Sequence, residues 1–524
     1  MDTYLPTYAE LYAVSDIHMG GEKTSTDNFQ IFNRGERLAG FIDFVGTVRP
    51  TEEVALLLNG DIIDSLAEDE VPGYVALDAN IALKMMDRIS NDPSFQPVWD
   101  ALAKFVKLPR RHLIIVVGNH DIELSLPVVE ADIRGRLSGG DAEANARIVF
   151  STHGGGFGCR VGNSRVFCTH GNEVDLMNWV DYNLLGQLAN AMTAGRIGDA
   201  QKWKPNGGTR VVIDVMNVVK RSYPFVDLLK PETAAIAGVL LAIDKDTFSK
   251  VNLGDAFPIV KDALKGRSTT SNLLGAEGEI LPTAPQRLVA DVAVQQLLGP
   301  NLLAAVSDSR GSVSTSSEDD LLLQAAAAAG SNVSPLDRRS TSGAPPQTLG
   351  AGDLVAGMFG LLSKTEALRR ALKDWMSGDK TYDPGNSADI LFNQMADRVN
   401  DSVDFTITGH THLARALQFK RGGYYFNCGT WIRLLRLTSE VLDSKDSFET
   451  AVWPVLNARR MDALDTALIP GPGGVVPLIF DRTNAVRISS SPTATTGTLL
   501  RVEGSTRSTV TFNTEPGTQP AVKP

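Results

Sequence analysis

The chain has 524 residues, of which 43% are hydrophobic and 21% are charged, a composition that allows a globular core. At roughly 100–200 residues per domain, this length allows a few domains or one large domain with insertions. The formal net charge of -11 disfavours a general nucleic-acid binder, because such proteins are usually basic.

Five short apolar runs occur along the chain, and each is followed by glycine or a small polar residue. Such runs are typical of buried strands. Helical patterns over residues 29–48 and 77–106 separate the first three runs, and the second pattern breaks near residues 91–93. Strands that alternate with helices indicate an α/β layer architecture, in which ligands bind where the strands end. The five runs cover residues 11–14, 54–58, 113–117, 165–168 and 405–407.

The stretch 184–403 differs from the flanking chain and predicts a large, mainly helical insertion. Its segment 331–352 is rich in Ser, Pro, Gly and Thr and predicts a disordered loop. Because the insertion begins and ends near histidine motifs, we hypothesise that it forms a cap over the site and selects the substrate. The predicted division is a core in two parts, 1–183 and 404–436, the insertion 184–403, and a partly irregular C-terminal extension 437–524.

Five of the seven histidines follow the apolar runs, and carboxylate and amide side chains join them there. In Asp16-x-His18 and His410-x-His412 the members are two residues apart, so extended backbone places both on one face. Asp61 has two carboxylate oxygens and can bridge two cations. Imidazole and carboxylate ligands suit Mn, Fe, Zn or Ni rather than Ca, and such cations allow an acidic protein to bind phosphate. The gathered residues are His18, His120, His170, His410, His412, Asp16, Asp61, Asp64 and Asn119.

These residues form five motifs in the order of the calcineurin-like metallophosphoesterase superfamily, which the chain resembles over about residues 11–175 and 404–433. The resemblance implies a four-layer αββα sandwich that the helical insertion interrupts. It also implies two divalent metal ions, with Mn²⁺ preferred and Fe, Zn or Ni as alternatives. The motifs are Asp16-x-His18, Gly60-Asp61-x-x-Asp64, Gly118-Asn119-His120-Asp121, His170-Gly171 and Gly409-His410-x-His412.

The resemblance further implies a role for each site residue. His120 would be the catalytic histidine beside the scissile phosphate, and Asp64 would hold its imidazole in position. The implied metal ligands are Asp16, His18 and His412 for the first ion, Asn119, His170 and His410 for the second, and Asp61 as the bridge.

The activity that the resemblance implies is hydrolysis of a phosphoester by a hydroxide that bridges the two metal ions. Residues 170–175 and 425–431 resemble the UDP-diacylglucosamine hydrolase-like branch. A small or lipid-linked phosphodiester or pyrophosphate is therefore preferred over a monoester as the substrate. His120 departs from that branch, whose founding enzymes carry Arg after the metal-binding Asn.

Two other functions stay open. One is a nuclease acting on DNA or RNA, which the acidic charge disfavours and a locally basic segment after residue 195 supports. The other is a non-catalytic metal-site scaffold, which the full set of ligands disfavours.

Several neighbouring residues keep two interpretations. Asp121 either supports the metal site or caps the following segment, and Asp64 by itself could be a cap or turn residue. Asp175 and Asn178 either line the pocket mouth or begin a helix. His153 lies in a glycine cluster, which favours a turn over a phosphate-binding loop.

The sequence contains three cysteines, too few for a disulfide framework and without C-x-x-C spacing. The N-terminus lacks a signal-peptide pattern, and the longest apolar stretch, near 234–243, is well short of the roughly 20 residues that span a bilayer. We therefore expect free thiols and a cytoplasmic protein without a transmembrane segment. Peripheral membrane contact stays open, and the sequence does not indicate the oligomeric state.

Overall fold

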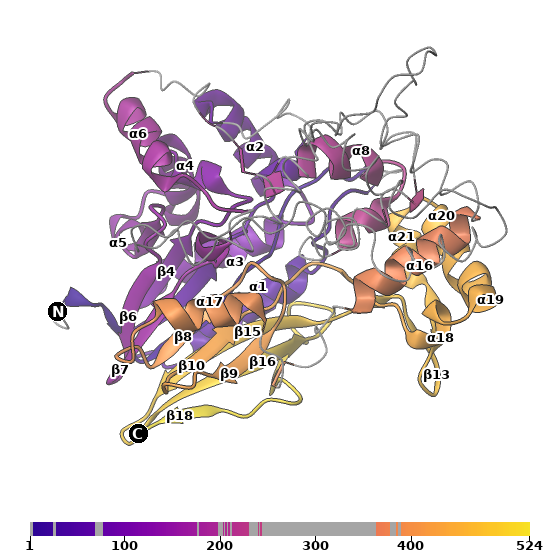
Figure 1. Cartoon of the computed structure of the whole chain (residues 1–524). Helices are drawn as coiled ribbons and strands as arrows, with labels where there is room; N and C mark the ends of the chain where they lie inside the picture. The colour runs from indigo at the N-terminus through magenta and orange to yellow at the C-terminus, as the bar shows by residue number, and fades with distance from the viewer. Residues whose placement is uncertain are drawn as a thin grey trace, which may run out of the picture. The chain divides into compact units, whose positions relative to one another are not determined.

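The chain divides into two compact units (Figure 1). Unit 1 comprises Met1–Thr209, Lys380–Leu434 and Phe480–Pro524, and unit 2 comprises Arg210–Asp379 and Leu435–Ile479. The segment 331–352, predicted to be a disordered loop, lies outside the described residues. No helix in the described part of the chain is long and apolar enough to cross a membrane. The computed structural model describes residues 4–24, 28–68, 77–175, 178–196, 203, 205–206, 208–209, 212–229, 239, 242–243, 363–377, 384–385 and 389–524.

The larger sheet of unit 1 has eight strands in the order β17-β16-β15-β2-β3-β4-β5, with β18 paired to β16. Strands β2 to β5 are parallel, and β15 runs antiparallel to β2. The register pairs Val486 with Ala13, so the C-terminal strands extend a sheet that the N-terminal region begins. The strands are β2 (Glu10–Val14), β3 (Val54–Asn59), β4 (Arg111–Val116), β5 (Ile148–Ser151), β15 (Thr483–Ser490), β16 (Thr495–Glu503), β17 (Thr511–Thr514) and β18 (Ala521–Lys523).

The second sheet of unit 1 has six strands in the order β1-β6-β7-β8-β10-β9. Its centre joins two distant parts of the chain, because β7 and β8 are parallel neighbours and pair Val166 with Phe405. The strands are β1 (Thr7–Tyr8), β6 (Phe157–Val161), β7 (Ser164–Cys168), β8 (Phe405–Thr408), β9 (Arg415–Gln418) and β10 (Tyr424–Asn427).

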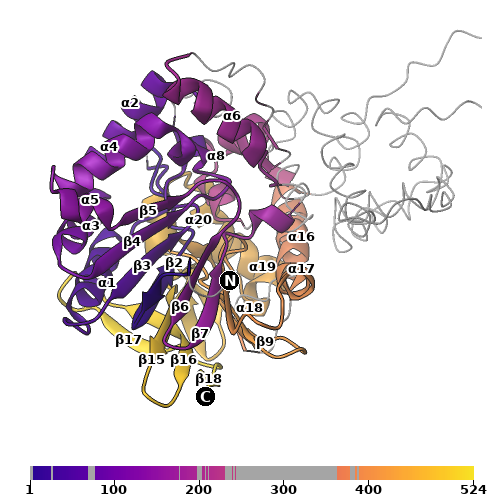
Figure 2. The same cartoon turned by 90° about the vertical axis from the view of Figure 1, so that its left-hand side faces the viewer.

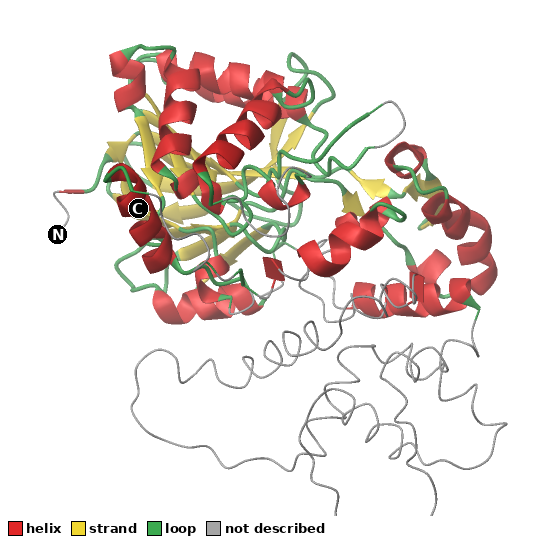
Figure 3. Ribbon diagram, turned by 90° about the horizontal axis from the view of Figure 1, so that it is seen from above, coloured by secondary structure: helices red, strands yellow, loops and turns green. Residues whose placement is uncertain are grey.

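Helices and sheets of unit 1 form layers around separate apolar cores. One core contains inward side chains of both sheets, such as Leu57 of β3 and Ile407 of β8. A second core lies between β2–β4 and helices α1 to α5, which cover the outer face of the larger sheet (Figure 2). Figure 3 shows helices lying against the strands. A third joins α17 to the smaller sheet. The predicted α/β class with two sheets between helical layers is thus confirmed. The helices are α1 (Gly35–Thr47), α2 (Ala79–Asn91), α3 (Gln96–Lys107), α4 (Pro127–Ser138), α5 (Ala142–Ala146), α6 (Tyr182–Thr193) and α17 (Ile390–Arg398).

Local sequence explains where the helices begin and end. The Asp78 side chain accepts hydrogen bonds from Asn80 N and Ile81 N at the start of α2. The break predicted near residues 91–93 is confirmed, since α2 ends at Asn91 and α3 begins only at Gln96. Both helices place an apolar face in the core beside the sheet.

The units divide the chain at places other than the predicted boundaries. Residues 480–524, which were expected in a partly irregular extension, supply β15 to β18 of the larger sheet. Helix α17, which was expected in the insertion, packs Leu391 and Met395 beside Tyr425 of the smaller sheet. The first difference arises from long-range strand pairing, which leaves little local signal in a segment rich in Thr, Ser and Gly. The second arises from packing of α17 on the smaller sheet.

The described parts of unit 2 are mostly helical. Lys364 Nζ at the start of α16 donates a hydrogen bond to Tyr223 Oη at 2.6 Å, and Arg369 of the same helix donates to the Leu442 carbonyl. These contacts join three segments that are distant in sequence. The elements are a π-helical turn (Val212–Met216), α8 (Asn217–Lys220), a 3₁₀ turn (Pro224–Leu228), α16 (Lys364–Ser377), α18 (Ser439–Leu442), α19 (Lys445–Ser447), a second π-helical turn (Phe448–Val452), α20 (Trp453–Asn457), α21 (Met461–Thr466), β12 (Leu468–Gly471) and β13 (Gly474–Pro477).

Candidate metal centre

All predicted site residues lie in loops that follow strands of the two sheets in unit 1. The loops from different sheets meet, because the backbone N–H of His410 donates to Asp16 Oδ1 at 3.0 Å. Asp16 and His18 follow β2, Asp61 and Asp64 follow β3, Asn119 and His120 follow β4, His170 follows β7, and His410 and His412 follow β8.

The site holds most of the unusual backbone in the described part of the chain. Eight non-glycine residues in the described part of the chain have positive φ angles, and five of these eight are predicted metal ligands. Non-glycine residues adopt such angles rarely, and concentrated backbone strain is typical of functional sites. The His18 N–H donates to the Asp61 carbonyl at 3.0 Å, which holds the two loops together. The five residues are Asp16 (52°), His18 (53°), Asp61 (51°), His410 (70°) and His412 (56°).

Motif glycines allow the ligand side chains to approach closely. A Cβ on Gly118 would collide with the Asp61 carboxylate, and a Cβ on Gly60 would collide with the His170 ring. Gly60 also has a φ of 85°, which L residues rarely adopt. Gly409 is confined in the same way by the loop after β2. The glycines in the motifs are therefore steric requirements of the site.

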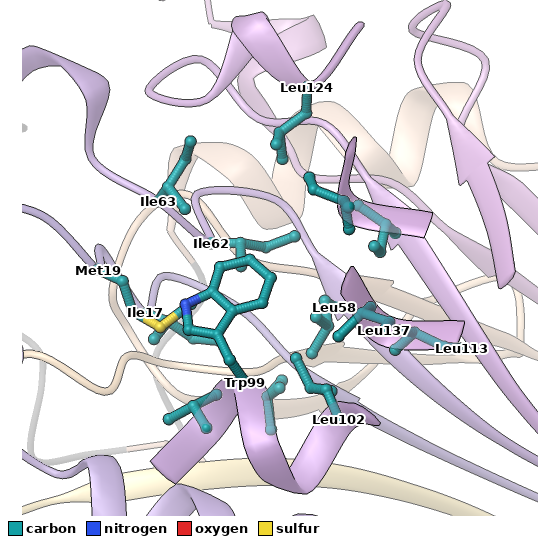
Figure 4. Packing of buried hydrophobic residues seen from close by; sticks show 14 of the residues in the cluster. Ile17, Met19, Leu58, Ile62, Ile63, Trp99, Leu102, Leu113, Leu124 and Leu137 are labelled. Atoms are coloured by element: carbon teal, nitrogen blue, oxygen red, sulfur yellow. The ribbon is translucent and has the colours of Figure 1, made fainter. Parts of the chain in front are cut away.

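Apolar residues between the site residues fix the loops in the helix-side core. Ile17 and Met19 alternate with the two site residues of the first loop, and they pack beside Trp99 of α3 (Figure 4). Ile62 and Ile63 separate the two carboxylates of the second loop and enter the same cluster (Figure 4). This alternation leaves the polar side chains free to face the site.

Asp16, His18 and His412 form the first group, whose ligand atoms all lie within 4.8 Å of one another. The two imidazoles face each other, since His18 Nε2 and His412 Nε2 are 3.2 Å apart. His412 Nε2 also lies 3.3 Å from Asp16 Oδ1. Two ring nitrogens and a carboxylate oxygen converge there, a donor set that suits a divalent transition metal.

Asp61, His170 and His410 form the second group, which meets the same distance limit of 4.8 Å. His170 Nε2 lies 3.2 Å from Asp61 Oδ2, and His18 Nε2 of the first group lies 3.8 Å from the same oxygen. One carboxylate oxygen therefore adjoins both groups. The His120 N–H donates to the other oxygen, Asp61 Oδ1, at 2.9 Å, which brings the loop of Asn119 to this group.

Buried polar atoms test whether these residues fit a metal ion. Among the described residues, Asn119 Oδ1 and His170 Nε2 are buried without a hydrogen-bond partner. His170 Nδ1 donates to the Asn59 carbonyl at 2.8 Å, so in the neutral ring the lone pair lies on Nε2. Buried atoms of this kind are normally satisfied, and a bound cation would satisfy both. The residues fit the metal ions that their pattern predicts.

The carboxylates set a negative field that favours cations. Burial acts to raise the pKa of Asp61, but the charges of His170 and His120 lower that pKa well below its usual value. Burial acts to lower the pKa of His170, but the Asp61 charge raises it to about 10, and the pKa of His120 rises to about 9 mainly through Asp61 and Asp64. Protons on His170 and His120 thus balance the carboxylates, a role that a bound cation would take over.

His120 lies between the carboxylates and solvent. Its Nδ1 is 3.2 Å from Asp64 Oδ1, and since the carboxylate accepts, Nδ1 carries the proton. The remaining nitrogen of a 17% exposed side chain stays available to a ligand. Asp64 precedes a short 3₁₀ turn (Ser65–Ala67) without capping it through its side chain. Its contacts are instead with His120 and with His18 Nδ1, 3.7 Å away.

Asp121 supports the site and does not cap the next segment. Its Oδ2 accepts from Ile62 N at 2.7 Å, and its Oδ1 accepts from Gly118 N at 2.6 Å. No side-chain cap bond forms at the following 3₁₀ turn. Burial, together with the Asp61 charge, raises the pKa of Asp121 to about 7. The carboxyl group ties the loop after β3 to the loop after β4.

Asn427 is a supporting residue that sequence reasoning did not single out. Its Nδ2 donates to the Gly409 carbonyl at 2.7 Å and to Thr411 Oγ1 at 3.1 Å, which fixes the loop that carries His410 and His412. Three residues later, Thr430 Oγ1 donates to the Asp16 carbonyl at 2.9 Å. The only sequence signal for these roles was the resemblance of segment 425–431 to one branch of the superfamily.

The remaining residues with two interpretations lie around this centre. His153 lies in the loop between β5 and β6, and positive φ angles at Gly154 and Gly156 favour the turn. It is exposed and joins neither metal group within the described chain. Asp175 and Asn178 do not begin a helix, and Asp175 lies beside His410.

Comparison with known families agrees with this geometry. Residues 10–227 match the model of the calcineurin-like phosphoesterase family, and the match includes all site residues except His410 and His412. None of the curated proteins compared with the chain matches it. The family match supports the superfamily that the motifs resemble, and together with the two His/Asp groups it supports a metal-dependent phosphoesterase.

Proposed function

We propose that the protein is a dinuclear metal-dependent hydrolase that cleaves a phosphodiester or pyrophosphate bond. The observation that carries the proposal is the position of Asp61 Oδ2, which lies 3.2 Å from His170 Nε2 and 3.8 Å from His18 Nε2. A carboxylate beside two separate donor sets suits a bridge between two cations. Asn119, with its buried unpartnered Oδ1, completes the second group.

Two bound divalent cations would supply Lewis-acid chemistry, polarising a phosphoryl oxygen and activating water. The protein residues supply orientation and a proton. Asp64 holds His120 Nδ1–H at 3.2 Å, so His120 Nε2 is the atom that can donate a proton to the leaving oxygen when the ring is charged. Burial acts to lower the pKa of His120, but Asp61 and Asp64 raise it, and the contact with Asp64 would still favour the charged form when Asp61 binds the cations.

The finer features of the proposal rest on chemical fit and resemblance. Mn²⁺ is our preferred ion because the donors are imidazole, carboxylate and amide oxygen, with Fe, Zn or Ni as alternatives. The preference for a phosphodiester or pyrophosphate, in a small or lipid-linked substrate, rests on the likeness of segments 170–175 and 425–431 to the UDP-diacylglucosamine hydrolase-like branch. The free and buried state of all three cysteines supports a reducing, cytoplasmic location.

A metal add-back assay tests the proposal. Purified protein is treated with a chelator and then titrated with Mn²⁺, using bis-nitrophenyl phosphate and nitrophenyl phosphate as substrates. We expect metal-dependent hydrolysis with the diester preferred. Absence of hydrolysis with metal bound would favour a non-catalytic scaffold, and degradation of an oligonucleotide in parallel would favour a nuclease.

The insertion is our proposed determinant of substrate choice. The division into units changes how this must be tested, because α6 and α17 belong to unit 1. Both segments of unit 2, 210–379 and 435–479, should be replaced by short linkers. We expect altered selectivity on a panel of phosphoesters while two metal ions still bind. Unchanged selectivity in a folded variant would contradict this role.

A further inference from the structure

Asp175 makes a contact with the second metal group that the family resemblance does not assign. It follows a short 3₁₀ turn (Asn172–Val174) in the loop after β7. Asp175 Oδ2 lies 2.9 Å from His410 Nε2, and His410 belongs to the loop after β8. Because a carboxylate accepts hydrogen bonds, the proton of the neutral imidazole lies on Nε2 and the lone pair on Nδ1.

The Asp175 carboxylate is itself held in place. Asn178 Nδ2 donates to Asp175 Oδ2 at 2.7 Å, so the same oxygen receives two hydrogen bonds. The Asn178 N–H also donates to the Asp175 carbonyl at 3.1 Å. Asn172, which is fully buried, donates from Nδ2 to the Asn178 carbonyl at 3.2 Å. The acceptor is therefore positioned by its own loop and does not depend on His410.

The close approach of the two loops requires Gly171. Its φ is 122°, and a Cβ there would lie 3.2 Å from His410 Cβ and 3.0 Å from Leu391 Cδ2 of α17. A side chain at this position would be strained by the φ angle, and its neighbours Leu391 and His410 would have to shift by a few tenths of an ångström. The glycine directly after His170 thus allows the Asp175–His410 contact.

We propose that Asp175 is a positioning residue that fixes the tautomer and ring orientation of His410, so that Nδ1 is the nitrogen offered to the second metal ion. This inference rests on the proposed dinuclear function. In His170 the two ring nitrogens have the opposite roles, since Nδ1 donates to the Asn59 carbonyl and Nε2 is left for the metal. Both imidazoles of the second group would then be fixed by a hydrogen bond at the opposite nitrogen.

Asp175 is better suited to this role than to direct ligation. Its side chain is 31% exposed, whereas that of Asp61 is 2% exposed. Three groups of described residues meet the distance limit for a metal. One of them contains His410, together with Asp61 and His170, and none contains Asp175. Its loss should weaken the second site without removing a ligand, and supporting partners of this kind are typically worth about 10–100-fold in metal affinity.

Asp175→Ala and Asp175→Asn test the inference in the full chain, with Asp181→Asn as the matched control. Asp181 lies six residues further on and caps α6 by accepting from Leu184 N, so its substitution perturbs the same region without touching a histidine. The first measurement needs no metal. Ring ¹⁵N shifts of histidine-labelled apoprotein report tautomers, and His410→Gln identifies the signal. We expect an Nε2–H tautomer in the wild type and in Asp181→Asn, and a mixture in Asp175→Ala.

The second measurement is calorimetric titration with Mn²⁺. We expect one of the two sites to weaken about 10–100-fold in Asp175→Ala, less in Asp175→Asn, and neither site to change in Asp181→Asn. An unchanged His410 tautomer, or two unchanged affinities in Asp175→Ala, would overturn the inference. If the wild type bound no metal, the dinuclear function would fail, while the tautomer measurement would still decide the Asp175–His410 contact.

Discussion

The two metal groups differ in what holds their histidines before a cation binds. In the second group, each imidazole has an acceptor for one nitrogen, namely the Asn59 carbonyl for His170 and the Asp175 carboxylate for His410. In the first group, His412 Nδ1 is buried and lacks a hydrogen-bond partner among the described residues. The second group is therefore oriented by the protein, whereas the first group depends more on the cation itself.

The two groups also differ in which part of the chain supports them. Each group takes two of its three residues from 10–227, the segment that matches the family model, and its third from the loop after β8. The first group is supported from the C-terminal half. The Trp431 N–H donates to the Asp16 carbonyl at 3.0 Å, and Trp431 Nε1 donates to the Asn484 carbonyl of β15 at 3.0 Å. The loop of Asp16, near the N-terminus, is thus supported by a strand near the end of the chain.

Asp61→Asn is expected to have the largest effect, because it acts on both groups at once. One preorganised electrostatic contact is worth about 10²–10³-fold in rate, so two such losses multiply to roughly 10⁴-fold or more. Hydrolysis of bis-nitrophenyl phosphate and metal content after gel filtration measure the outcome. The surface variant Asp132→Asn, whose carboxylate pairs with Arg136 on α4, serves as the control. Two tightly bound metals and near-normal turnover in Asp61→Asn would contradict a bridging role.

His120→Asn is expected to separate proton transfer from metal binding. The side chain belongs to neither of the two proposed metal groups, so both ions should stay bound while turnover falls about 10²–10⁴-fold. His112→Asn is the matched control, since His112 lies on β4, the strand that precedes the loop of His120, and pairs with Glu53. Metal titration and turnover should be measured on both variants. Equal turnover in the two would refute the assigned role of His120.

Glu515→Gln tests whether the C-terminal strands stabilise the side of the first group. The buried carboxylate accepts from Arg482, Arg501 and Asn484 at 2.6 Å each. Removing one partner of such a buried network costs about 3 kcal/mol. Urea unfolding should show this loss at pH 7, whereas Glu143→Gln, at a side chain that is 90% exposed, should change little.

The effect of Glu515→Gln on the unfolding free energy should depend on pH. Burial acts to raise the pKa of Glu515, but hydrogen bonds from Arg501 and Asn484 and the Arg482 charge lower it below its usual value. A lowered folded-state pKa stabilises the protein above the unfolded pKa of about 4.3, and this stabilisation is lost as the pH falls through the folded pKa. The difference in unfolding free energy between wild type and Glu515→Gln should therefore shrink below about pH 4. A difference that stayed constant with pH would exclude ionised Glu515 as its source.

The sequence pointed to the residues of the candidate centre because proposed ligands such as Asp16 and Asn119 follow apolar strands closely. Strand type and strand end are local features, and the parallel order then brings the loops together. The roles of Asp121 and Asp175 stayed open for a physical reason. Asp121 accepts from Ile62, 59 residues away, and Asp175 contacts His410, 235 residues away, so no local pattern separates support from capping.

The C-terminal strands could not be predicted from the sequence for a similar reason. β15 and β16 contain many Thr and Ser residues, and their pairing with each other spans only a short turn. Their place in the fold is set by the contact between β15 and β2, which joins Ile488 to Leu11 across most of the chain. Composition indicated an irregular tail, whereas burial of Val486 and Ile488 against the sheet makes it part of the core.

The smallest expected effect is the difference in Mn²⁺ affinity between the two groups, and histidine variants of each group can measure it. Because the second group is already oriented, we expect its Mn²⁺ affinity to exceed that of the first group by about 10–100-fold. In calorimetric titrations, His412→Gln should remove the weaker site and His410→Gln the tighter one, with exposed His153→Gln as the control. If His412→Gln removed the tighter site instead, the first group would be the better oriented of the two. Support from Trp431 and the C-terminal strands would then outweigh the hydrogen bonds of Asn59 and Asp175.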